Sequence, residues 1–329
     1  MGASLALASK QIIIYGGIPV CITGIIGNAL NLIVFLSLET FRKNACAFYL
    51  IMMSMFNIGQ LCFGFFFSRV IIALIGTDGT TSSLFYCKFR ISLSQFCVAA
   101  SLTCFCLATV DQFFATCSQP RWQRFSNIKV AHRLVIITIL LWICHGIPYI
   151  VFYHHIESST NTTSCGSDNL MFNNYRAYFF VLGLIGYLPV LVAASFGYLS
   201  YRKIQQIAYR TVPIVRRELD KQLTSMVLIQ VIFNVFTILP YTTANALSTD
   251  ASFTNDPNIQ RQFQLILNII IIIYYIYFAS PFYIYMCASE RFRRQFLYVL
   301  SSLYCFNQCK QPTMVHNQIT PEVQTTPKQ

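Results

Sequence analysis

The residues that could catalyse a reaction or bind a metal ion are few in this sequence, and their spacing does not bring them together. His154 and His155 are adjacent, but no third ligand lies near them and the spacing of the zinc proteases is missing. The sequence also contains no Gly-x-Ser-x-Gly nucleophile motif and no phosphate-binding loop. We therefore predict that the protein is not an enzyme and that it needs no metal ion or other cofactor.

Charged residues are unusually rare along the chain. Only 10% of the 329 residues are charged and 55% are hydrophobic, whereas a soluble domain has about 25% charged residues. Too little charge is present to cover a surface facing water, so we predict an integral membrane protein with membrane lipids among its partners. The net charge of +12 comes from short basic clusters between apolar stretches, which are typical of anchoring at lipid headgroups. This distribution argues against nucleic acid as a partner.

Seven segments without Asp, Glu, Lys or Arg are each long enough to cross a bilayer, which takes about 20 apolar residues in a helix. These segments cover residues 11–38, 44–68, 91–110, 134–156, 177–201, 222–249 and 262–289. Backbone groups in hydrocarbon must hydrogen-bond internally, so each segment is predicted to be helical. The predicted fold class is all-α, a seven-transmembrane helical bundle over residues 11–289.

The distribution of Lys and Arg predicts the orientation of the bundle. Of the 23 basic residues, 17 lie on one side of the predicted membrane and 6 on the other, and the richer side is normally cytoplasmic. We therefore expect a multi-pass plasma-membrane protein with a short extracellular N-terminus (residues 1–10). Residues 290–304 should form an amphipathic cytoplasmic helix on the membrane surface. Residues 305–329 are rich in Pro and Thr and are predicted to be a disordered tail.

Three kinds of modified residue follow from this topology. Of the 13 cysteines, only Cys87 and Cys165 fall at or beyond the outer membrane boundary. Two cysteines in an oxidising compartment predict one disulfide, between the third helix and the loop after the fourth. Asn161 begins an Asn-Thr-Thr glycosylation sequence in the same loop. On the cytoplasmic side, Cys305 and Cys309 are candidates for palmitoylation.

Short motifs at ordered positions point to a known family. They are Gly27-Asn28, Asp111-Gln112-Phe113, Trp142 followed by Pro148, and the helix prolines Pro189, Pro240 and Pro281. With the seven helices and the predicted cystine, they resemble the rhodopsin-like (class A) G-protein-coupled receptors over residues 27–296. The resemblance implies a receptor that transmits binding of an extracellular ligand to a heterotrimeric G protein, with arrestin as a further partner.

Several residues depart from the family pattern. Asn57 stands where most members have an Asp that anchors a sodium site, so the resemblance does not extend to that site. Gln112 replaces the arginine of Asp-Arg-Tyr, and Ile238 replaces the tryptophan that precedes the proline of the sixth helix. Pro240 and Pro281 remain, and the kinks they introduce give the sixth and seventh helices pivots for a conformational switch.

The departure at Gln112 changes the expected inactive-state lock. In the family the arginine pairs with the neighbouring acid, here Asp111, and bridges to an acid at the start of helix six, where Asp220 stands. A Gln112–Asp220 hydrogen bond would be roughly half as strong as a charge-assisted pair. Another possibility is that Asp111 pairs with a cation near the inner helix ends, and the candidates are Arg121, Arg124 and Lys221. If Gln112 weakens the inactive-state lock, Gln112→Arg should restore the lock and lower basal activity.

The ligand is expected in the outer half of the bundle. Residues at family pocket positions are Ser94, Gln95, Val98, Tyr241, Asn245 and Tyr274. Ser94 falls where amine receptors carry an Asp, so a biogenic amine would lack its counter-ion. Arg69, Lys88, Arg90 and Arg176 lie near the outer mouth and suit an anionic ligand such as a peptide terminus, although such cations also reach lipid phosphates. We therefore expect a peptide-like or chemosensory ligand.

Other functions were weighed against signalling. The departures at Asn57, Gln112 and Ile238 would suit a non-signalling decoy receptor or a subunit of a heteromer. A transporter is a weaker alternative, because transporters usually carry ionisable groups within the membrane or internal repeats, and the sequence has neither feature to any extent. The ligand's identity, the G protein and the oligomeric state do not follow from the sequence.

Overall fold

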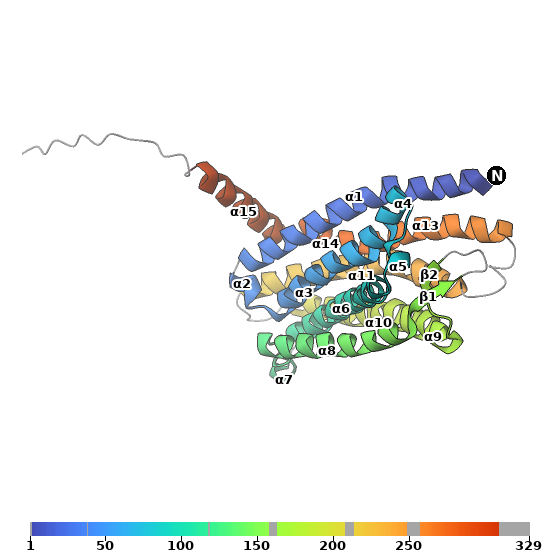
Figure 1. Ribbon diagram of the computed structural model, residues 1–329. Coiled ribbons are helices and arrows are strands. Elements are labelled where there is room, and N and C mark those ends of the chain that lie inside the picture. The colour runs from blue at the N-terminus through green and yellow to red at the C-terminus, as the bar shows by residue number, and fades with distance from the viewer. Residues whose placement is uncertain are drawn as a thin grey trace, which may run out of the picture.

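The structure is a computed structural model that describes residues 2–37, 39–117, 119–157, 163–207, 214–248 and 257–308. Within these residues seven helical stretches are long and apolar enough to cross a membrane, and they lie alongside one another as a bundle (Figure 1). Below they are called spans one to seven. The predicted all-α, seven-helix fold is confirmed.

Four spans are single helices and three are composite. The single helices are α1 (Gly2–Ser37) for span one, α6 (Leu84–Thr116) for span three, α8 (Ile128–Phe152) for span four and α11 (Ile214–Leu247) for span six. Span two joins α3 (Ala45–Gly59), the π-helical segment η1 (Gln60–Val70) and α4 (Ile71–Ile75). Span five joins α9 (Leu170–Asn174), the π-helical segment η2 (Tyr175–Tyr187) and α10 (Leu188–Ile207). Span seven is α13 (Pro257–Ala279) followed by α14 (Pro281–Ala288).

Shorter helices connect or follow the spans. They are α2 (Glu39–Arg42), α5 (Gly79–Ser82), α7 (Pro120–Gln123) and, after span seven, α15 (Glu290–Gln308). In the first turns of α15 the Phe292 ring is fully buried, whereas Leu297 and Tyr298 are exposed on another face. This helix therefore attaches to the bundle at its start and presents apolar side chains further along, as a helix on a membrane surface does.

Side-chain caps set where several helices begin. Asn44 accepts a hydrogen bond from the Ala47 amide at 3.0 Å, and Asn127 accepts one from the Lys129 amide at 2.9 Å. These amides belong to first turns and have no partner within their own helix. The helices extend from cap to cap, so α6 covers residues 84–116, which is longer than the charge-free segment 91–110. Span four begins earlier than predicted, at Ile128, and ends earlier, at Phe152, because a strand begins at residue 154.

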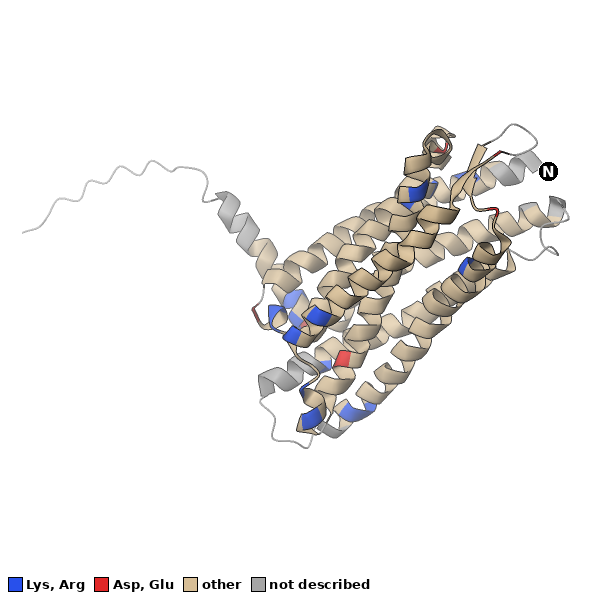
Figure 2. Cartoon of the chain, turned by 60° about the horizontal axis from the view of Figure 1, so that its bottom comes forward, with Lys and Arg blue, Asp and Glu red and all other residues tan. Residues whose placement is uncertain are grey.

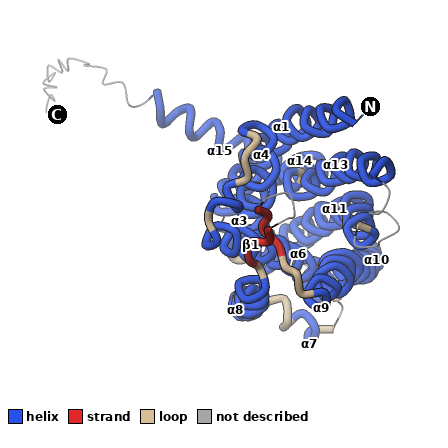
Figure 3. Tube along the Cα trace, turned by 45° about the vertical axis from the view of Figure 1, so that its right-hand side comes forward, coloured by secondary structure: helices blue, strands red, loops and turns tan. Residues whose placement is uncertain are grey.

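A two-stranded hairpin follows span four. Strands β1 (His154–Glu157) and β2 (Thr163–Gly166) are antiparallel, with His155 opposite Cys165. Cys165 forms the predicted disulfide with Cys87 at the start of α6, and His155 Nε2 lies 2.8 Å from the Thr80 carbonyl oxygen in α5. Apart from this hairpin the described chain is helix and loop (Figure 3). Asn161 lies outside the described residues.

The two ends of the bundle differ in charge. The first turns of α1 and the hairpin lie at one end, which the charge distribution predicts to be extracellular and which we call the outer end. Lys and Arg side chains gather at the opposite, inner end, where the start of α15 lies (Figure 2). The distribution seen in three dimensions therefore follows the asymmetry expected from the sequence.

The bundle is packed inside and apolar outside. Gly24 of span one lies so close to span seven that an added Cβ would sit 2.7 Å from the Ala279 Cβ, so only glycine permits this approach. On α8, by contrast, large apolar side chains such as Ile137, Leu141 and Ile147 are more than half exposed. A surface of this kind faces lipid rather than water.

We predict that loss of the disulfide destabilises the protein. Cys87→Ser and Cys165→Ser should each lower the free energy of unfolding by about 2–4 kcal/mol, and the double variant should lose no more than either single variant. The measurement is thermal denaturation of the purified protein in detergent. Cys144→Ser is the control, because that thiol is exposed on α8 and unpaired. Equal losses in Cys144→Ser and the two disulfide variants would contradict the prediction.

Candidate functional site

A buried amide network joins spans one, two, three and seven. Asn28 Nδ2 donates to the carbonyl oxygens of Gly24 and Phe278, both at 2.8 Å. Asn57 Nδ2 donates to Asn28 Oδ1 at 3.2 Å, and Asn57 Oδ1 accepts a short hydrogen bond from the Ser101 hydroxyl. Asn28, Asn57 and Ser101 are completely buried. The position that carries an acid in most of the resembled family is therefore filled here by a neutral group with neutral partners.

The inner half of span six is hydrogen-bonded to its neighbours. The Thr224 hydroxyl donates to Gln112 Oε1 of span three at 2.9 Å. One turn and a half further along span six, Gln230 Oε1 accepts from the Tyr285 hydroxyl of span seven at 2.7 Å. All four side chains are at least 97% buried. Because uncharged groups form both bonds, each is a moderate contact worth about 0.5–1.5 kcal/mol rather than an ion pair.

Asp111 is bound differently from Gln112. Its Oδ2 accepts a hydrogen bond from the Ser126 hydroxyl, after α7, at 3.1 Å. The bond of Gln112 goes to Thr224, one turn into the membrane from Asp220. The side chain of Asp220 lies outside the described residues, as do those of Cys305 and Cys309. The Gln112–Asp220 bridge and the cation partners proposed for Asp111 therefore stay hypotheses.

The outer half of the bundle contains a tyrosine cluster. Tyr241 of span six stacks on Tyr274 of span seven, with ring centroids 4.0 Å apart. Tyr275 stacks on Phe65 of span two at 4.1 Å, and its hydroxyl donates to the Gly64 carbonyl at 2.6 Å. These rings connect spans two, six and seven in the outer half of the bundle. Two of the six expected pocket residues, Tyr241 and Tyr274, are therefore in direct contact.

The other expected pocket residues surround this cluster. The Ser94 hydroxyl donates to Gln60 Oε1 at 3.1 Å, and Val98 is buried in the same apolar core as Tyr274 and Ile238. Asn245, one turn outward from Tyr241, has a buried Oδ1 without a hydrogen-bond partner among the described residues. Gln95 is partly buried on span three.

Three arginines lie around the same cluster. Arg69 and Arg90 are within electrostatic range of the Tyr275 hydroxyl, and Arg69 and Arg176 are within range of the Tyr241 hydroxyl. None of the ion pairs between described residues involves these arginines. The Nε atoms of Arg90 and Arg176 are buried and have no hydrogen-bond partner among the described residues. A buried cationic donor without a partner is costly, so this arrangement favours an anionic group or ordered water between the arginines.

The two prolines expected to act as pivots occupy different settings. Pro240 lies inside the continuous helix α11, next to Tyr241, and separates the tyrosine cluster from the inner contacts of span six. Pro281 is the first residue of α14, directly after the break at Ser280. Proline is tolerated at the first helical position because its missing N–H would have no partner there. Span seven is thus interrupted at its proline, whereas span six continues through its own.

Sequence reasoning missed several residues of these contacts, among them the polar residues Gln60, Thr224, Gln230 and Tyr275. A signal was present, because polar side chains within otherwise apolar spans are expensive in a membrane and normally face the bundle interior. The sequence did not reveal which of them meet, since the partners come from different spans.

Comparison with known proteins places these contacts in a family context. The model of the seven-transmembrane receptors of the rhodopsin family matches residues 27–314. A curated relative is somatostatin receptor type 2 of the mouse, Mus musculus. It is 20% identical over 302 residues, a match that covers 89% of this chain and 78% of the relative.

We predict that Asn57→Asp makes stability depend on sodium. A carboxylate would place an oxygen against Asn28 Oδ1 in place of the amide donor that now binds it, which should cost about 1–3 kcal/mol. A bound cation would satisfy both oxygens. The melting temperature of the variant should therefore be lower than that of the wild type in choline chloride and recover in sodium chloride. Stabilisation of the wild type by sodium to the same extent would contradict the neutral network.

Proposed function

Because the chain belongs to the rhodopsin family of seven-transmembrane receptors, we propose that it signals from the plasma membrane to a heterotrimeric G protein, with its N-terminus outside. The family is one of receptors, and the chain is a multi-pass membrane protein. A ligand would bind at the outer end among the tyrosines and arginines, and the G protein would bind at the inner end. Arrestin, which the family resemblance implies, would use the same inner surface.

The construction of span six carries this proposal. At its outer end Tyr241 touches Tyr274, and at its inner end Thr224 and Gln230 make neutral hydrogen bonds to spans three and seven. Pro240 lies between these two sets of contacts. A ligand that changes the tyrosine contact can therefore bias span six between two packings. The inner contacts are weak enough that a ligand with a modestly higher affinity for one packing would shift the populations of the two packings.

We infer that the ligand carries an anionic group. Arg90 and Arg176 come from spans three and five, and the buried Nε of each has no hydrogen-bond partner among the described residues. Arg69 adds positive charge from span two. Guanidinium groups suit carboxylate and phosphate because they donate in a fork. This positive charge supports a small acid or the carboxyl terminus of a peptide as the ligand. A biogenic amine is disfavoured, because Ser94 stands where amine receptors carry the Asp that pairs with the amine.

A second candidate is a receptor-like protein that does not signal. It is favoured by Gln112, which stands in place of the family arginine and whose Nε2 has no partner among the described residues. The experiment that decides between the two candidates measures G-protein activation by the wild type and Gln112→Arg at matched surface expression. The ligands are tested in pairs: peptides with free or amidated carboxyl termini, and small acids with their neutral amides. Activation by the wild type supports signalling. Silence of both, despite good surface expression, would favour the decoy or heteromer subunit.

The anion site predicts a charge-dependent loss of potency. Arg90→Gln and Arg176→Gln should each lower the potency of an activating acid by about 10- to 100-fold, because one hydrogen bond to a charged group is worth about 1.5–3 kcal/mol. The potency of the matched neutral amide should change little. Lys10→Gln is the control, because it removes the same charge from an exposed position on α1. Equal potency of acid and amide on the wild type would refute the anionic ligand.

The inner contact predicts a rise in basal activity. Thr224→Val keeps the shape of the side chain but removes the hydroxyl that donates to Gln112, so basal G-protein activation should rise about 2- to 10-fold. Thr237→Val is the control, because the Thr237 hydroxyl bonds to the Phe233 carbonyl of its own helix. Basal activity that rises equally in both variants would point to general loosening of span six instead.

A further inference from the structure

The start of α15 donates two hydrogen bonds to one side chain of span six. Gln222 Oε1 accepts from the Ser289 hydroxyl at 2.8 Å and from the Arg291 backbone N–H at 3.1 Å. The Ser289 oxygen in turn accepts from the Phe292 N–H at 3.2 Å, as an N-cap does. Amides in the first turn of a helix lack partners of their own. Gln222 therefore supplies, from another helix, one of the acceptors that the first turn of α15 needs.

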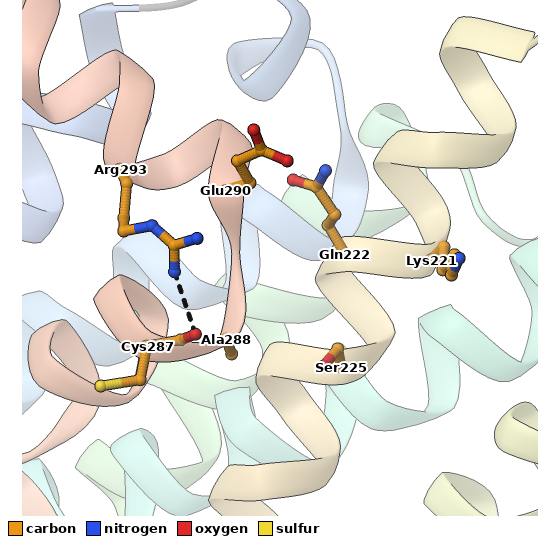
Figure 4. Close-up of a pocket in the computed structure, with 7 residues that line it drawn as sticks. All are labelled: Lys221, Gln222, Ser225, Cys287, Ala288, Glu290 and Arg293. Atoms are coloured by element: carbon orange, nitrogen blue, oxygen red, sulfur yellow. Dashed lines mark hydrogen bonds between the residues drawn. The ribbon is translucent and has the colours of Figure 1, made fainter.

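These bonds border a groove between span six and the junction of α14 with α15. The groove has a volume of about 310 Å³ and is lined by Lys221, Gln222 and Ser225 on one side and by Cys287, Glu290 and Arg293 among others on the opposite side. Figure 4 shows Gln222 projecting from α11 toward Glu290 at the start of α15. The amide thus crosses from one wall of the groove to the other.

The wall opposite span six is rigidly attached to the bundle. Arg293 Nη1 donates to the carbonyl oxygens of Met286 and Cys287 at 2.9 and 3.1 Å, which caps the end of α14. The buried Phe292 ring packs against Phe35 of span one, with centroids 5.3 Å apart. Gln295 Nε2 donates to the Ser37 hydroxyl at 2.8 Å. The start of α15 is therefore fixed to spans one and seven, and Gln222 joins span six to that fixed element.

We propose that Gln222 is a latch that holds the inner end of span six closed by capping α15. Outward movement of span six breaks both bonds at once and leaves the Arg291 N–H and the Ser289 hydroxyl without this acceptor. The latch is separate from the Gln112–Thr224 contact, because Gln222 and Thr224 lie on different faces of α11, and Thr224 bonds to span three whereas Gln222 bonds to the start of α15. Its effect on signalling rests on the proposed receptor function, whereas its effect on the helix ends does not.

Hydrogen–deuterium exchange of the purified full-length protein tests the latch without a G protein. In Gln222→Ala, exchange of amides in two peptides, one around residues 289–294 and one around 221–228, should rise about 3- to 10-fold, the effect of losing about one neutral hydrogen bond. Gln222→Glu keeps an acceptor oxygen at this position and places negative charge at a helix N-terminus, where it is favourable, so exchange should stay near that of the wild type. Ser225→Ala, in the same groove, should change neither peptide.

Basal G-protein activation of the same variants completes the test. Under the proposed function, Gln222→Ala should raise basal activation about 3- to 10-fold, the same factor as for exchange, and Gln222→Glu should leave it unchanged. Faster exchange in both peptides with no G-protein signal from any variant would support the latch while contradicting G-protein coupling. Faster exchange confined to residues 289–294 would reduce Gln222 to a local cap and overturn the latch. Unchanged exchange in Gln222→Ala would overturn it as well.

Discussion

The amide of Asn28 fixes how spans one, two and seven lie against one another. No water is available in hydrocarbon, so a buried amide must find its partners within the protein. Asn28 Nδ2 donates to backbone carbonyls of its own span and of span seven, and Asn28 Oδ1 accepts a hydrogen bond from Asn57 Nδ2. The Ser101 hydroxyl extends the network to span three. Backbone carbonyls cannot rotate away as side chains do, so this network forms a frame with a defined geometry.

Span six is attached to this frame in a different way. Its inner contacts are made mainly between side chains: Thr224 with Gln112, Gln230 with Tyr285, and Gln222 with Ser289. Such bonds can be exchanged for bonds to water or to a partner protein when the helix moves. Their uncharged character avoids the large desolvation cost of burying ions. The same character means that these bonds favour the observed packing only moderately, as the proposed two-state role of span six requires.

The sequence was a good guide where one physical rule acts alone. The number of spans, the all-α fold and the Cys87–Cys165 disulfide follow from hydrocarbon thickness and from the compartment of each cysteine, and the structure has all three. Helix ends were less predictable, because caps such as Asn44 decide them rather than the nearest charge. The strand at His154 was missed because residues 154–156 still belong to the segment without Asp, Glu, Lys or Arg that was assigned to span four.

The contacts of the site were the hardest to foresee. Gln112 was identified as a departure, but its bond to Thr224 depends on the rotation of span six, which no local pattern encodes. The same holds for Gln222, whose partners lie 67 and 69 positions further along the chain. Polar residues in apolar spans can be listed from the sequence, whereas their pairing is a property of the packed bundle.

The hairpin at the outer mouth affects how a ligand would enter. Its strands are tied to α6 through Cys87 and to α5 through the His155 contact with Thr80. A rim secured at two points keeps its dimensions before any ligand arrives. Under the proposed function, a ligand entering at this end would therefore lose little conformational entropy in ordering this part of the entrance.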